Sequence, residues 1–333
     1  MIGSQFLPPL SGEELKKMVH SDKQVRKPII AGMVYEKSFM MIAADPGLGK
    51  SIVALQAAAE LSCALPVFGC LDVPEPRITY HIQLERDASE IFERLAMMEK
   101  VIPINYDKLF IDDQLKGINV LKDEHVSMVL ARIKKYCPRP DMIQIDPAYG
   151  AVAGGLRDDI PASMFTRFST ILQHELGCSN WINHHTVKDS YSSFTGDKIK
   201  KNDPFYGSQW LKAHVTASFY MSARGNGEGV LLEKKKDSHS NLLDEIVLTF
   251  DPVTCTSQMD INESKINKRD KLLLYLRACC NSGSKPTVKA MSAASKMTVR
   301  YVMELLNEEP FKSHLLPKKD AGKATVFEVR RGI

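Results

Sequence analysis

The sequence lacks the features that would place it in a membrane or outside the cell. No stretch reaches the ~18 uncharged apolar residues that a membrane-spanning helix needs. The opening MIGSQFLPPLSGEELKK does not have the basic-then-apolar order of a signal peptide. The seven cysteines form no CxxC pair and no Cys/His cluster at zinc-binding spacing. We therefore expect a cytoplasmic protein with free thiols and no membrane partner.

Extreme compositions are also absent. Of the 333 residues, 44% are hydrophobic and 25% charged, which excludes disordered, collagen-like and coiled-coil classes. The charge is uneven, because the chain from Ser264 onward holds 15 Lys and Arg against 6 Asp and Glu, a net +9, whereas residues 1–263 carry −5. A basic C-terminal region indicates an anionic partner, nucleic acid first, although a solvated basic surface gives the same count.

Apolar runs of strand length alternate with helical patterns through the first two thirds of the chain. The expected strands are residues 38–44, 77–85, 108–112, 141–146 and 178–185. Such alternation predicts right-handed crossovers and a mostly parallel sheet with helices on both faces, an α/β fold. Three later segments, 214–223, 229–236 and 244–251, are expected to extend the sheet as antiparallel strands.

Four parts follow from this pattern: an N-terminal arm (1–27), an α/β domain (28–252), a polar linker (253–267) and a C-terminal domain (268–333). In the last part three helices precede two strands, which is the order of a winged helix-turn-helix. Its third helix is expected at 298–308, with an apolar face comprising Val299, Val302, Met303 and Leu306. Winged helices bind duplex DNA or proteins, and both partners stay open here.

The strongest motif is ADPGLGKS, residues 44–51, between an expected strand and an expected helix. A glycine-rich turn in this position predicts a P-loop, because its N–H groups and the helix N-terminus favour phosphate oxygens. Lys50 is expected to bridge the β- and γ-phosphates, and the Ser51 hydroxyl to bind Mg²⁺. The expected ATP-binding residues are Asp45, Pro46, Gly47, Leu48, Gly49, Lys50, Ser51 and Ile52. Ala44 stands where Gly is usual, and its small side chain should still allow the loop to form.

Two carboxylates are expected beside this loop. Asp146 ends the apolar strand 141–146 and should project from the carboxyl edge of the sheet, where it can hold a Mg²⁺-bound water. Glu85 ends the strand after the P-loop helix and should emerge at the same edge, where it can orient or deprotonate an attacking water. The structural alternative for Asp146 is a strand-ending residue that caps the next turn.

The order of these motifs resembles the RecA-type ATPase superfamily, and within it the plasmid RepA-like and DnaB-like hexameric replicative helicases. NHHTVK (183–188) is similar to the His-His-x-x-Lys segment of the RepA-like proteins, and Gly207-Ser208 resembles a Gly-Ser element that follows it. The resemblance covers residues 28–250. It implies an ATP- and Mg²⁺-dependent homo-oligomer, with a hexameric ring favoured and the ATP site at the subunit interface.

The same resemblance assigns roles to site residues. It implies that Glu85 is the catalytic glutamate and that His184 or His185 senses the γ-phosphate, a position where DnaB-like relatives often carry Gln. A structural histidine at this strand end is about equally expected. The resemblance also implies a cation supplied by the neighbouring subunit, for which the candidates are Arg224, Lys234, Lys235 and Lys236. A solvated strand end explains the three lysines equally well.

A polar segment, residues 186–207, is too long for an ordinary connection and mixes lysines with aromatic residues. Cations for phosphates and rings for base stacking are what a loop that binds single-stranded DNA needs. The residues expected to contact DNA are Lys188, Tyr191, Phe194, Lys198, Lys200 and Lys201, with Arg300 in the C-terminal domain. The glycine-rich loop 148–159 resembles a companion DNA loop, although a flexible surface loop explains it nearly as well.

The function expected from the sequence is an ATP-dependent DNA translocase or helicase that acts in replication of a phage, plasmid or other mobile element. The alternative is an ATP-switched loader or regulator that binds DNA or a protein without unwinding. A small-molecule kinase ranks third, since no Arg-rich lid segment follows the P-loop.

Overall fold

Helices alternate with strands along most of the chain. The computed structural model describes residues 11–20, 26–152, 156, 158–186, 209–224, 229–238, 243–261, 263–266, 268–308, 311–318 and 325–330. The helices are α1 (Gly12–Val19), α2 (Lys50–Ser62), α3 (Ala88–Met98), α4 (Asp123–Tyr136), α5 (Asp159–Leu176), α6 (Gln209–His214), α7 (Lys268–Ser282), α8 (Val288–Ser295), α9 (Val299–Leu305) and α10 (Phe311–His314), with short 3-10 turns η2 (Tyr106–Lys108) and η3 (Ala148–Ala151). None of the helices in these ranges is long and apolar enough to cross a membrane.

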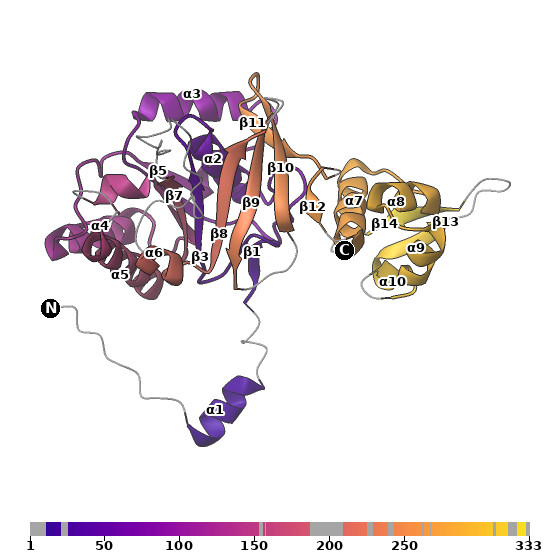
Figure 1. Ribbon diagram of the computed structural model, residues 1–333, viewed down its shortest axis with the longest axis horizontal. Coiled ribbons are helices and arrows are strands. Elements are labelled where there is room, and N and C mark those ends of the chain that lie inside the picture. Colours follow the sequence, from indigo (N-terminus) through magenta and orange to yellow (C-terminus); the bar gives the residue numbers. More distant parts are fainter. Residues whose placement is uncertain are drawn as a thin grey trace, which may run out of the picture.

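One large sheet forms the centre of the protein (Figure 1). The strands are β1 (Pro28–Ile30), β2 (Val34–Tyr35), β3 (Phe39–Ala44), β4 (Thr79–Gln83), β5 (Leu109–Asp112), β6 (Met142–Asp146), β7 (Ser179–His185), β8 (Ala217–Ala223), β9 (Val230–Asp237), β10 (Leu243–Asp251), β11 (Thr256–Met259), β12 (Lys265–Ile266), β13 (Leu315–Lys318) and β14 (Val326–Val329). Their order in the large sheet is β11-β10-β9-β8-β3-β7-β6-β4-β5, with β12 also paired to β10. The strands from β8 to β5 run parallel, which confirms the α/β class with a mostly parallel sheet.

The late strands differ partly from expectation. β9 and β10 are antiparallel extensions of the sheet, but β8 pairs in parallel with β3. The helix α6 precedes β8 and returns the chain to the amino edge, so β8 continues the parallel set instead of opening the antiparallel one. Sequence periodicity shows a strand but not its direction, because direction depends on the connection before it.

Helices cover both faces of the sheet. α2 packs on one face through Ala54 and Ala57, while its opposite side, Leu55 and Ala58, meets α3. α4 and α5 cover the other face in a second cluster that includes Phe165. Small alanines let α2 approach the sheet closely, so the helix that carries the P-loop lysine at its start is fixed on two sides.

The segment expected to be a linker, 253–267, instead supplies β11 and β12, and both pair with β10. α2 holds β11 through a side chain: Gln56 Nε2 donates to the Ser257 carbonyl at 2.7 Å, and Ser257 N–H donates to Gln56 Oε1 at 2.6 Å. Thr256 and Ser257 are buried despite their polarity. The polar composition of this segment therefore reflects buried hydrogen bonding and not a solvated connection, which corrects the expected linker.

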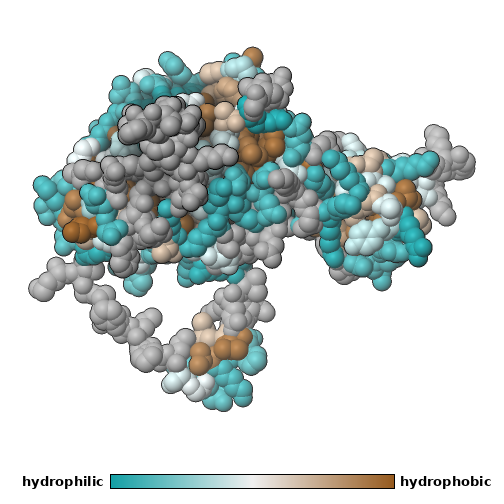
Figure 2. All heavy atoms as spheres, viewed as in Figure 1, coloured by the Kyte–Doolittle hydropathy of each residue, from teal (hydrophilic) through white to brown (hydrophobic). Residues whose placement is uncertain are grey.

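The N-terminal arm contains a helix that its sequence did not suggest. α1 has no buried residue, and it lies away from the sheet in Figure 1. Leu15, Met18 and Val19 are 47%, 42% and 52% exposed, and Figure 2 shows a brown strip on this helix. With only one apolar turn, the 3.6-residue period is too short to recognise in the sequence.

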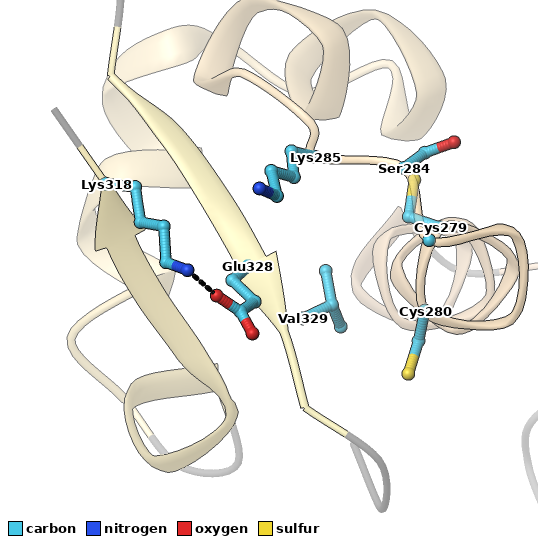
Figure 3. Close-up of a pocket in the computed structure, with 8 residues that line it drawn as sticks. Cys279, Cys280, Ser284, Lys285, Lys318, Glu328 and Val329 are labelled. Atoms are coloured by element: carbon cyan, nitrogen blue, oxygen red, sulfur yellow. Dashed lines mark ion pairs between the residues drawn. The ribbon is translucent and has the colours of Figure 1, made fainter. Parts of the chain in front are cut away.

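The C-terminal region has its own core. Leu272, Leu276, Met291, Val302, Phe311 and Leu315 form it, from α7 through β13. In the described part of this region four helices, and not the expected three, precede the β13–β14 hairpin, because α10 follows α9. A hollow of about 240 Å³ lies between α7 and the hairpin, beside the Lys318–Glu328 ion pair (Figure 3).

The buried face of α9 differs from the expected one. Val302 and Leu305 are buried, whereas Val299 is 43% and Met303 56% exposed. Thr298 caps the helix by accepting a hydrogen bond from the Tyr301 N–H at 3.2 Å. The helix is therefore rotated relative to the face chosen from sequence, where several apolar residues offered two overlapping stripes.

Glu60 is a buried carboxyl on α2. It accepts hydrogen bonds from Gln56 Nε2 at 2.9 Å and from the Phe68 N–H at 3.0 Å. Burial nevertheless raises the pKa of Glu60 from 4.5 to about 8. Because the folded state keeps a proton that the unfolded state loses, stability is full below pH 4.5 and falls as pH rises toward 8.

We predict that Glu60→Gln flattens this pH dependence. Between pH 5 and 8 the free energy of unfolding of the wild type should fall by about 1.4 kcal/mol per pH unit more than that of the variant. Urea unfolding at a series of pH values measures the difference in slope. The exposed Glu124→Gln on α4 is the control, and equal slopes for wild type and Glu60→Gln would contradict the prediction.

Candidate active site

The P-loop joins β3 to α2 at the carboxyl edge of the sheet. Gly47 and Gly49 have φ of 84° and 88°, and Gly49 precedes the first residue of the helix. Only glycine adopts this left-handed backbone without strain. Lys50 begins α2, and its Nζ donates to the Ala44 carbonyl at 2.8 Å and the Asp45 carbonyl at 3.0 Å. The loop thus places an ammonium against a turn built to receive an anion.

Three carboxylates surround this ammonium. Burial lowers the pKa of Lys50, while Asp146, Asp45 and Glu85 act in the opposite direction. β4 and β6 bring two of them together: Gln83 pairs with Asp146, and the Leu84 N–H donates to the Asp146 carbonyl at 2.8 Å. The structure therefore brings the expected lysine, aspartate and glutamate into one site.

Asp146 suits the expected magnesium role. It is 2% exposed, and its Oδ2 has no hydrogen-bond partner among the described residues. A buried carboxylate oxygen of this kind fits a cation or a cation-bound water, because an unsatisfied buried acceptor is otherwise costly. With Ser51 at the start of α2, these residues would hold Mg²⁺, which would neutralise charge on the phosphate oxygens.

The two histidines of β7 point to different places. β7 lies between β3 and β6, and His185 pairs with Ala44 directly before the P-loop. Burial and Lys50 lower the pKa of His185, against the opposing effect of Glu85, so its imidazole is neutral near pH 7. His184 is fully buried on the opposite face of β7, as strand alternation requires. His185 is therefore the member of the pair that faces the site.

Two polar residues next to the histidines also belong to the site, and sequence reasoning missed them. Asn183 Nδ2 donates to the Lys50 carbonyl at 3.3 Å and fixes the first turn of α2. Thr186 Oγ1 donates to Asp45 Oδ1, and its N–H donates to the Ala44 carbonyl at 3.2 Å. Polar side chains at the end of an otherwise buried strand were the available signal.

Tyr149 is a third missed residue. It lies in η3, directly after β6, and its ring centroid is 4.9 Å from that of His185 with an interplanar angle of 45°. Burial raises the pKa of Tyr149 to about 12, with the neighbouring Glu85 carboxylate as the next cause. Its hydroxyl therefore stays protonated beside the expected catalytic glutamate.

The candidates for a cation supplied to a neighbouring subunit occupy different settings. Arg224 follows β8 at the carboxyl edge and forms an ion pair with Glu263, and Lys234 pairs with Asp244 at 3.3 Å. Lys236 Nζ donates to the Lys212 and Ala213 carbonyls at 3.0 and 2.8 Å, at the end of α6. Lys236 lies beside Ser218, toward the amino end of β8 and away from the P-loop of its own chain.

Most of the expected DNA contacts cannot be placed. Lys188, Tyr191, Phe194, Lys198, Lys200 and Lys201 lie outside the described residues, as do 153–155 and 157 in the glycine-rich loop. Arg300 is described: it is exposed on α9 and pairs with Glu304 at 3.1 Å.

Comparison with known proteins agrees with this geometry. The family model described as an AAA domain matches residues 14–191, more than half of the chain, so the chain belongs to this family. Among solved structures, the ATPase domain of a DnaB-like helicase is similar, with a TM-score of 0.52 and 14% identity over 73% of this chain and 95% of that chain. At this identity the likeness shows a common fold. No curated protein matched.

The fold and the site together define a RecA-type P-loop ATPase. It is related to the DnaB-like helicases, as the order of motifs along the sequence predicted.

We predict that Gly47→Ala weakens ATP binding at least about tenfold, because a Cβ at φ 84° costs about 1–2 kcal/mol and turns the loop N–H groups away from phosphate. The matched control is Gly117→Ala, with φ 80° and likewise no atom within 4 Å of the added Cβ. Both variants should lose similar stability, but only the first should lose affinity for ATP in a fluorescent-nucleotide titration. Equal affinities would refute the loop's phosphate role.

Proposed function

We propose that this protein is an ATP-dependent DNA translocase or helicase, acting in the cytoplasm in replication of a phage, plasmid or other mobile element. The observation that carries the proposal is the convergence of Lys50, Glu85, Asp146 and His185 at one edge of the sheet. A buried lysine for phosphate, a carboxylate for the cation and an exposed carboxylate for water are the parts that phosphoryl transfer to water requires.

Each residue has a distinct task in this proposal. Lys50 and the loop N–H groups bind the β- and γ-phosphates, and Glu85, which is exposed at the edge, accepts the proton of the attacking water. Asp146 and Ser51 hold the cation. Neutral His185 contacts the γ-phosphate, and β7 runs from it directly toward 186–207, so loss of that contact can be transmitted to the expected DNA loop.

Single-stranded DNA is the proposed substrate of the 186–207 segment. Support comes from its composition, since its four lysines can neutralise phosphates and its aromatic rings can stack on bases. Resemblance to hexameric helicases supports a ring in which each ATP site lies between subunits. Arg224, at the carboxyl edge, is better placed than Lys236 to reach a neighbouring site.

For the C-terminal region we propose a winged helix that binds duplex DNA or a protein partner. The helices, the hairpin and the net charge of the tail support it. The outward face of α9 favours a protein partner, because Val299 and Met303 are exposed there and Arg300 is neutralised by Glu304. An apolar helix face with a paired arginine offers little to backbone phosphates.

The alternative is an ATP-switched loader or regulator that binds DNA or a protein without unwinding. Both functions use every site residue named above. They differ in turnover: a translocase hydrolyses ATP much faster on single-stranded DNA and displaces a strand, whereas a switch needs neither.

We predict that Lys50→Ala and Glu85→Gln both reduce ATP hydrolysis at least about a hundredfold, for different reasons. Lys50→Ala should lose nucleotide affinity, because the ammonium contacts phosphate charge. Glu85→Gln should still bind ATP, because the amide only fails to accept the proton of water. Steady-state hydrolysis and nucleotide titration separate the two, and near-normal turnover in either variant would overturn the site.

We predict that replacing Lys198, Lys200 and Lys201 together with Ala suppresses the stimulation of hydrolysis by single-stranded DNA while leaving DNA-free hydrolysis unchanged. Each lost contact should flatten the slope of log affinity against log salt by about 0.7. The control is the triple replacement of Lys122, Lys134 and Lys135 at α4, which removes equal charge. Unaltered stimulation and salt slope would leave the nucleotide switch as the better function.

A further inference from the structure

Tyr149 lies at a point of the site where residues from three strands meet. It follows β6 and Asp146 by three positions, contacts His185 at the end of β7, and lies beside Glu85, just beyond β4. The inference drawn from this position rests on the proposed ATPase role of Glu85.

The backbone that carries Tyr149 is fixed to the strand that precedes Glu85. Gly150 packs so closely on Leu84 that an added Cβ would lie 2.7 Å from the Leu84 Cβ. The Gly150 N–H donates to the Pro147 carbonyl at 3.1 Å, and the Ala151 carbonyl accepts from the Val120 N–H at 2.9 Å. η3 is therefore anchored on both sides, and Tyr149 has little freedom to move relative to Glu85.

The side chain of Tyr149 is held as firmly as its backbone. Its ring packs at 45° on His185, which fixes where the phenol oxygen lies. Glu85 itself is exposed, and its N–H is tied to Gln83 Oε1 at 3.0 Å, so its backbone is placed while its carboxylate needs a further contact. The Tyr149 hydroxyl is the neutral donor next to that carboxylate.

We propose that Tyr149 is a positioning residue that holds the Glu85 carboxylate in the orientation from which it receives the proton of the attacking water. One carboxylate oxygen accepts from the phenol hydroxyl, and the other stays available to the water. Because Tyr149 remains protonated at neutral pH, it acts only as a donor and does not compete as a base. Its ring contact also makes the placement of Glu85 depend on His185.

The test is Tyr149→Phe, which keeps the ring on His185 and removes only the hydroxyl. We expect kcat for ATP hydrolysis to fall about tenfold, part of the roughly 10²–10⁴ that a general base contributes. The KM for ATP should change less than about twofold, because no contact with nucleotide is lost. The control is Tyr136→Phe on α4, which is 51% exposed. Unchanged kcat, or equal changes in kcat and KM, would overturn the proposal.

A double-mutant cycle with Glu85→Gln distinguishes positioning from a general effect. If Tyr149 acts through Glu85, Tyr149→Phe should cause no further loss in the Glu85→Gln background. Multiplicative losses would show that Tyr149 acts elsewhere and would overturn the proposal. Normal hydrolysis in Glu85→Gln alone would instead overturn the proposed role of Glu85, so the two failures are distinguishable.

Discussion

The parallel pairing of β3, β7, β6 and β4 is the constraint on which the rest of the site depends. Parallel strands end at the same edge of a sheet, so Ala44, His185, Asp146 and Gln83 finish side by side although they lie far apart in the chain. Each strand end then contributes a polar group directly after a buried apolar run. The register thus converts separate motifs into one constellation around Lys50.

This concentration of charge is unfavourable for folding and is offset by local structure. A buried ammonium with a lowered pKa and a buried carboxylate oxygen without a partner among the described residues both cost free energy. α2 supplies compensation, because it is buried between the sheet and α3 and its first turn is held by Asn183. The stability of the apolar layers therefore supports a site that is ready for phosphate and a cation.

Connections between layers are made by polar side chains inside the core. Gln56 joins α2 to β11, and Glu60 on the same helix holds the Phe68 N–H. These residues hold the antiparallel side of the sheet to the helix that carries the P-loop. A buried polar network with satisfied hydrogen bonds specifies one arrangement, where an all-apolar surface would tolerate several.

The sequence alone determined the features that depend on neighbouring residues. The P-loop with its positive-φ glycines, the apolar strands and the strand-end positions of Asp146 and His185 follow from local geometry, and the structure agrees with them. Only the tertiary structure decided which residues meet. Tyr149 and Asn183 joined the site, His184 turned to the other face, β11 entered the sheet, and α9 buried Val302 while exposing Val299. The physical reason is that periodicity specifies which faces of an element are apolar, whereas long-range packing and strand register select the partner of each face.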